Sequence, residues 1–303
     1  MCLDHCDAPS LGEMILRFPF LPVAALMVSL ITLCAGTSLA KGLFPFVGAE
    51  GTTTYRLVFS TLLLMAFWRP WRRQWTWADL PSLVFFGVTL GAMNLLFYSA
   101  IKTVPFGLAI AIEFTGPLAV ALWSSKKPLD FLWIVLAVAG MALIMPLSQY
   151  FGLGDASPAL DPFGIACALG AGCCWGIYIV LGQRVADRYG AFATPMGMLV
   201  AAIVVLPFGL SVAGSSLLNL EWMLAGLGIA LLSSAIPYSL EMYSLQHLPK
   251  QTFSILLSLE PAVGALAGWL VLSEQLSTQQ FCAIGLIMAA SMGSAVTSRH
   301  RLP

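Results

Sequence analysis

Four ionisable side chains stand inside long apolar stretches of this sequence, and their types could bind protons or a charged ligand. Glu113 is the one charged residue in AIAIEFTGPLAVALW (109–123), and Glu260 lies in SLEPAVGALAGW (258–269). Glu241 in PYSLEM and Arg56 in TTTYRL complete the set. A charge at the centre of an apolar membrane helix costs about 2.5 to 3.5 kcal/mol on insertion scales, so each of the four needs a reason to be there.

Glu113 and Glu260 each lie close to a proline, Pro117 in EFTGP and Pro261 in SLEP. Proline removes a helical hydrogen bond and opens the preceding turn, which frees carbonyl groups to face a polar cavity. At about 1.5 Å per residue, both acids lie near the middle of their apolar stretches. The sequence therefore predicts two broken helices with a carboxylate at the centre of each. A structural carboxylate that hydrogen-bonds a neighbouring helix is the alternative.

The other two charges lie nearer the ends of their apolar stretches. Glu241 could take part in transport, snorkel to the interface or serve helix packing. Arg56, near the outer end of its stretch, could snorkel, pair with a glutamate or bind the carboxylate of a ligand. The residue types alone do not rank these roles.

Polar and aromatic residues supply further candidates for a cavity lining. Asn94, in GAMNLLFY, is expected at about the depth of Glu113 on the preceding helix, as a ligand group or as an interhelical hydrogen-bonding group. Tyr98, Trp175 and Tyr178 could line a cavity with rings and hydroxyls, although aromatic residues in membrane helices also serve packing.

The sequence lacks the motifs of several functional classes. Cys2, His5 and Cys6 form a lone cluster that lacks the second half of any zinc-binding spacing, so no metal is expected. The sequence contains no H-E-x-x-H, no G-x-S-x-G and no Gly-rich phosphate loop, which argues against a membrane enzyme, against ATP as energy source and against a bound cofactor. A channel would need a filter-like segment of carbonyls, and none is evident. The balance of 14 basic and 14 acidic residues gives no indication of a nucleic-acid partner.

The elements that must position these residues are membrane helices. Of 303 residues, 59% are hydrophobic and only 9% are charged, which predicts an all-α polytopic membrane protein. Ten segments are long and apolar enough to span a bilayer: 20–40, 51–68, 80–101, 105–124, 130–147, 162–182, 192–213, 222–245, 250–271 and 278–298. The longest connection, 148–161, divides them into five and five.

The distribution of basic residues predicts the orientation. With the N-terminus inside, eleven of the fourteen Lys and Arg residues fall on the inner side, while only Lys41 and Lys102 fall on the outer side. We therefore expect cytoplasmic tails at 1–19 and 299–303 and an outer linker at 148–161.

The two groups of five spans resemble each other. A shift of 144 residues places Pro105 on Pro249 and Pro117 on Pro261, and superposes SAIKTVP on YSLQHLP. Because five is odd, related halves must be inverted in the membrane, an arrangement typical of secondary transporters. The repeats are predicted at 20–147 and 162–298, with Glu113 and Glu260 on equivalent helices.

Six segments carry a resemblance to a known family: GTSLAKGLFP, AIEFTGPLAVALWSS, LGAGCCWGIYIV, PYSLEM, SLEPAVGALAGW and AASMGS. Together with the order of spans, they resemble the EamA branch of the drug/metabolite transporter superfamily over about 20–297. The resemblance implies ten helices in two inverted repeats, and proton-linked export of small neutral amino acids, such as threonine or homoserine, across a bacterial inner membrane. It also implies that Glu113 and Glu260 are cavity residues. Export of another metabolite or a drug is the alternative, and a homodimer is compatible with the sequence.

Overall fold

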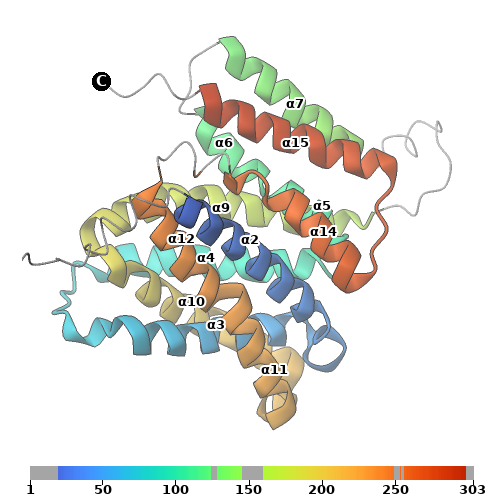
Figure 1. Cartoon of the computed structure of the whole chain (residues 1–303). Helices are drawn as coiled ribbons and strands as arrows, with labels where there is room; N and C mark the ends of the chain where they lie inside the picture. The colour runs from blue at the N-terminus through green and yellow to red at the C-terminus, as the bar shows by residue number, and fades with distance from the viewer. Residues whose placement is uncertain (1–19, 124–127, 145–159, 249–252, 254–255, 298–303) are drawn as a thin grey trace, which may run out of the picture.

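The computed structural model describes residues 20–123, 128–144, 160–248, 253 and 256–297, and this part of the chain is helical without strands (Figure 1). The helices, in chain order, are α2 (Phe20–Lys41), α3 (Phe44–Trp68), η1 (Pro70–Arg72), α4 (Leu80–Ala100), α5 (Phe106–Glu113), α6 (Thr115–Trp123), α7 (Pro128–Ile144), α9 (Pro162–Tyr189), η2 (Gly190–Phe192), α10 (Ala193–Ala213), η3 (Gly214–Leu218), α11 (Leu220–Ala230), η4 (Leu231–Ala235), α12 (Ile236–His247), α14 (Glu260–Leu272) and α15 (Thr278–Thr297). The predicted tails at 1–19 and 299–303 and most of the predicted linker fall outside the described residues.

The prediction of an all-helical polytopic membrane protein is confirmed. Five helical stretches in the described part are long and apolar enough to cross a membrane: Leu21–Lys41, Leu80–Ala100, Pro162–Gly182, Ala193–Leu218 and Leu220–Glu241. Shorter apolar helices cover Phe106–Val120, Phe131–Gly140 and Glu260–Leu272. The count of ten spans stays a prediction.

Helix α3 begins seven residues earlier than the sequence predicted. Pro45 lies in its first turn, where a missing N–H costs little, and the helix bends at Gly48, whose φ of 72° suits glycine. Glu50 interrupts the apolar run, so hydropathy placed the start of the span at residue 51. Arg56 therefore lies roughly three turns inside α3, and its predicted position near the helix end is wrong.

Two of the predicted spans are interrupted near their acids. The span predicted at 105–124 is divided into α5 and α6 at Phe114, and the span predicted at 250–271 contains a turn at Ser258–Leu259 before α14 begins. The stretch from α11 to α12 is continuous but contains the π-helical turn η4. Prolines 117, 237 and 261 follow these irregular points, as their lack of an N–H predicts.

The helices pack in pairs around the centre of the molecule. Helix α3 packs against α10, α5 against α14, and α7 against α15, while α4 contacts α9 and α2 contacts α12. Figure 1 shows α7 and α15 side by side at one end of the molecule and α3 with α10 at the other. Large apolar side chains remain exposed on the outside, including Phe131 and Val138 of α7 and Leu206 and Leu210 of α10, as expected where lipid covers the surface.

Candidate functional site

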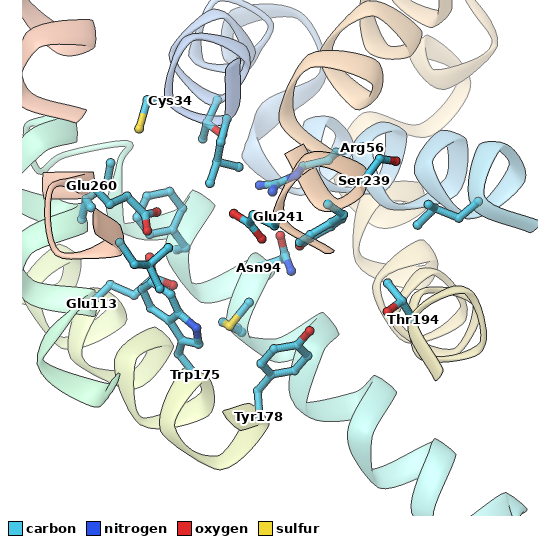
Figure 2. Close-up of a pocket in the computed structure, with 18 of the residues that line it drawn as sticks. Cys34, Arg56, Asn94, Glu113, Trp175, Tyr178, Thr194, Ser239, Glu241 and Glu260 are labelled. Carbon is cyan, nitrogen blue, oxygen red and sulfur yellow. The ribbon is translucent and has the colours of Figure 1, made fainter. Parts of the chain in front are cut away.

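A cavity of about 290 Å³ lies among helices from both halves of the chain (Figure 2). Its size is close to the lower end of small-molecule sites, which run from about 300 to 1,000 Å³. Side chains that carry polar or ionisable groups line it from eight helices: Cys34 and Thr37 of α2, Arg56 and Trp68 of α3, Asn94 of α4, Glu113 of α5, Trp175 and Tyr178 of α9, Thr194 of α10, Tyr238, Ser239 and Glu241 of α12, and Glu260 of α14. The cavity thus combines a largely apolar wall with a few convergent charged groups.

The helix interruptions bring Glu113 and Glu260 to the same cavity. Glu113 is the last residue of α5 and Glu260 is the first residue of α14, and α5 packs against α14. Both side chains are 8% exposed. Figure 2 shows the two acids on one side of the cavity, with Trp175 nearby. Two carboxylates that the sequence places 147 positions apart therefore lie in one polar site.

The backbone around Glu113 is packed very closely against α9. Pro117 has no N–H to bond the Glu113 carbonyl, and that carbonyl faces Gly172. A Cβ on Gly172 would lie 2.6 Å from the carbonyl oxygen, and Gly116 packs against the backbone of Gly172 in turn. The absence of side chains at these two glycines allows the interrupted helix to approach α9 this closely.

Glu241 also belongs to the cavity. Its Oε1 lies 3.3 Å from the hydroxyl of Ser29 on α2, which can donate either to it or to the Pro237 carbonyl at 3.0 Å. The side chain points into the cavity instead of toward the helix end (Figure 2). Of the roles that the sequence left open, snorkelling does not fit this position.

Arg56 is held at the cavity wall by three neutral groups. Its Nε donates to the hydroxyl of Ser234 at 3.1 Å, Nη2 to the carbonyl of Ser233 at 3.1 Å, and Nη1 to the hydroxyl of Tyr98 at 3.4 Å. Its side chain is buried, 6% exposed, and does not snorkel. Within the part of the chain that the structure describes, no carboxylate lies within 4.0 Å of its guanidinium.

The remaining predicted residues divide between the wall and the layer behind it. Asn94 lines the cavity while its Nδ2 donates to the Leu90 carbonyl of its own helix at 2.9 Å. Tyr98 is fully buried and lies behind Arg56, so it supports the wall instead of lining it. Trp175 and Tyr178 line the cavity and pack on the rings of Phe114 and Phe86.

Sequence reasoning did not select Cys34, Thr194, Tyr238 or Ser239. Tyr238 had a usable signal, because it lies three residues before Glu241 and so shares its helix face. Cys34 and Thr194 had none, since small polar residues are common in membrane helices and nothing in their spacing marks a cavity. The described residues contain no cluster able to hold a metal, and Cys2, His5 and Cys6 lie outside them.

Two ion pairs lie at the ends of helices that the sequence places on the outer side. Lys41 Nζ lies 2.6 Å from Glu274 Oε1, and Lys102 Nζ lies 2.7 Å from Glu50 Oε1. The other oxygen of Glu274 accepts from the backbone N–H of Phe106, the first residue of α5, at 2.7 Å. The two contacts of Glu274 join α2 and α5 to the segment after α14.

Comparisons with known proteins place the chain in a family. The model of the EamA-like transporter family matches residues 162–296. The threonine/homoserine exporter RhtA of Escherichia coli (strain K12) is 49% identical over 280 residues, which cover 92% of this chain and 93% of that protein. The chain belongs to the EamA-like transporter family. Another threonine/homoserine exporter RhtA, from Salmonella typhimurium (strain SL1344), is 48% identical and covers 93% of both chains.

A more distant relative is also named as a transporter. The uncharacterized inner membrane transporter YedA of Escherichia coli (strain K12) is 26% identical over 77% of this chain and 75% of its own. A protein of known crystal structure superposes with a TM-score of 0.60 at 17% identity, over 91% of this chain and 98% of that one, which shows that the fold is shared.

EamA membership confirms three predictions. The resemblance to the family is real, the protein is a transporter and not an enzyme, and it is a multi-pass protein of the inner membrane. A small-molecule substrate and a lipid environment follow from the same family.

Proposed function

We propose that the protein is a secondary active exporter of small neutral amino acids, of the threonine and homoserine type, driven by protons through alternating access. The observation that carries the proposal is the cavity, which gathers Glu113, Glu241, Glu260 and Arg56 within a wall that is otherwise mostly apolar. An amino-acid zwitterion presents one positive and one negative group, and this cavity offers both complementary signs. The relatives that are 48–49% identical are named as exporters of threonine and homoserine.

Proton coupling follows from competition at a carboxylate. The cavity contains three acids and one guanidinium among the described residues, so full ionisation would leave uncompensated negative charge in a low-dielectric site. A bound proton or a substrate ammonium relieves that repulsion, and one carboxylate cannot hold both at once. We propose that Glu113 alternates between them and that Glu260 is its counterpart in the other half.

The helix contacts support inverted repeats at 20–147 and 162–298. In a molecule with a pseudo-two-fold axis, counterparts such as α3 and α10 or α7 and α15 can meet at the axis, and both of these pairs are in contact. The contact between α4 and α9 has a counterpart in the contact between α12 and α2, because such an axis would relate α4 to α12 and α9 to α2. The interruptions at Phe114 and Ser258 also lie at corresponding positions under the 144-residue shift.

The test uses purified protein in proteoliposomes with an imposed pH gradient and a set of radiolabelled amino acids. Wild-type protein should move threonine and homoserine. Glu113→Gln keeps the volume but not the titration, so it should abolish gradient-driven transport while unfolding at nearly the wild-type temperature, and Glu260→Gln should abolish or severely weaken transport. Glu221→Gln, on the exposed first turn of α11, is the matched control and should transport normally.

Two outcomes would overturn the proposal. If the protein expels a cationic drug or a purine but no small amino acid, the substrate assignment is wrong. If Glu113→Gln transports at the wild-type rate with unchanged dependence on the pH gradient, Glu113 is not the coupling site and its carboxylate has a packing role.

A further inference from the structure

Arg56 is a buried cation that donates hydrogen bonds to neutral groups. Its partners are two serines and a tyrosine, and the described part of the chain places no carboxylate within 4.0 Å of it. Buried charges in proteins are normally paired, because leaving one unpaired costs several kcal/mol of desolvation. The side chain lines the cavity, so the missing anion can arrive there as part of a ligand.

The groups that hold Arg56 come from an irregular turn in the other half of the chain. Ser233 and Ser234 lie in the π-helix η4 and are fully buried. Pro237, four residues after Ser233, has no N–H to take the Ser233 carbonyl into an α-helical bond, and this carbonyl accepts from Arg56 Nη2 instead. π-Helical turns occur frequently at functional sites. This one holds the guanidinium through two hydrogen bonds.

The hydrogen bonds leave a specific pair of donors. A guanidinium has five N–H groups, and the three contacts use one at Nε, one at Nη1 and one at Nη2. One N–H at each of Nη1 and Nη2 is not engaged by these contacts. A guanidinium that offers an N–H at both Nη atoms can bind the two oxygens of one carboxylate, as in the strong bidentate arginine–carboxylate pair. Figure 2 shows Arg56 reaching toward the cavity interior.

We infer that Arg56 is the subsite for the carboxylate of the transported molecule, and that Ser233, Ser234 and Tyr98 are its positioning residues. The inference rests on the proposed export of amino acids and deepens it, because it makes a free carboxylate a requirement of the substrate. Glu113, Glu241 and Glu260 face the same cavity and remain available for the ammonium group. An amine or a drug without a carboxylate would leave Arg56 unpaired and would bind less well.

The experiment compares threonine with threoninamide, which keeps the ammonium and hydroxyl groups but has no carboxylate. Uptake of radiolabelled threonine into proteoliposomes is competed with each compound. A charge-assisted bidentate contact corresponds to roughly 10- to 100-fold in binding, so threonine should compete better than threoninamide by about that factor in the wild type. In Arg56→Gln the ratio should fall close to one and KM for threonine should rise by roughly tenfold or more. Arg56→Lys keeps the charge but not the two-point geometry, and should give an intermediate ratio.

A second variant keeps the inference testable if Arg56→Gln does not fold. Ser234→Ala removes the acceptor for Nε, so it should raise KM for threonine several-fold and lower the threonine-to-threoninamide ratio while leaving kcat near wild type. Ser211→Ala, which removes an exposed hydroxyl on α10 outside the cavity, should change neither. If wild-type protein transports threonine but is competed equally by threoninamide, or if Arg56→Gln retains the wild-type ratio, the inference is wrong. If wild-type protein transports no amino acid, the proposed function itself has failed.

Discussion

The close contact between α9 and the interrupted helix can be tested with one methyl group. Gly172 of α9 faces the Glu113 carbonyl, and replacing it with alanine places a Cβ too close to that oxygen. Because Glu113 ends α5 and α9 carries Trp175 and Tyr178, separating the two helices changes the positions of cavity residues relative to one another. Gly172→Ala should therefore affect both stability and transport.

The size of the effect follows from the geometry. The Cβ would lie 2.6 Å from the Glu113 oxygen and 3.3 Å from its Cα and carbonyl carbon. The first distance is roughly 0.8 Å shorter than an ordinary van der Waals contact, so the two helices must separate locally. Such overpacking costs about 1 to 3 kcal/mol. Alanine in place of glycine within a helix recovers about 0.5 to 1 kcal/mol, which partly hides the overlap.

Gly285→Ala on α15 is the matched control. Nothing lies within 4 Å of the Cβ position at Gly285, so this variant gains the helix propensity without any overlap. The difference between the two variants therefore isolates the overlap, about 1 to 3 kcal/mol.

The measurements are unfolding of the purified variants in one detergent and threonine transport in proteoliposomes. Gly172→Ala should unfold at a lower temperature than Gly285→Ala and should transport more slowly than the wild type. Equal unfolding temperatures together with wild-type transport by Gly172→Ala would refute the close approach of α9 to Glu113.

Two further predictions concern the regions outside the spans. Asp79 accepts hydrogen bonds from the backbone N–H and the hydroxyl of Thr76, which lower its pKa from 3.8 to about 2. Because folding lowers this pKa, the ionised carboxylate stabilises the folded protein at pH values above the pKa of the unfolded state. This contribution is lost as the pH falls toward 2. Asp79→Asn should lower the unfolding temperature at neutral pH and flatten its decline between about pH 4 and pH 2, whereas an unchanged slope in a pH series of thermal unfolding would contradict the assignment. In a cysteine-free variant, an impermeant maleimide added outside intact cells should label a cysteine at Ser157 and should not label one at Gln74, and the opposite pattern would overturn the predicted orientation.

The sequence was most informative where a residue type conflicts with its surroundings. A carboxylate in an apolar helix is rare enough to mark a site by itself, and Glu113, Glu260 and Glu241 all line the same cavity. Pro117 and Pro261 marked the interrupted helices for the same reason, since proline cannot complete a helical hydrogen bond.

Sequence reasoning was weaker where the information lies in three-dimensional packing. Arg56 was placed too near the membrane surface because Glu50 breaks the hydropathy run although the helix continues through it. Tyr98 has the residue type of a cavity group, but it is fully buried behind Arg56, from which its hydroxyl accepts a hydrogen bond. The π-helical turn at 231–235 has no pattern of its own in LLSSA. Helix rotation and hydrogen-bond register depend on contacts between distant segments, which one sequence does not list.

The prolines connect the irregular helices to the chemistry of the cavity. Each of Pro117, Pro237 and Pro261 stands four residues after a residue whose carbonyl it cannot bond: Glu113, Ser233 and Leu257. Glu113 and Leu257 line the cavity, and the Ser233 carbonyl holds Arg56 at its wall. A proline inside a helix costs about 3 kcal/mol, and less in a first turn, where Pro261 stands. At Ser233 the freed carbonyl adds a polar group to the site without adding a further charged side chain to an apolar span. Each break also gives its helix a point at which it can bend, so the residues that would bind substrate stand where the two halves could rock between inward-facing and outward-facing states.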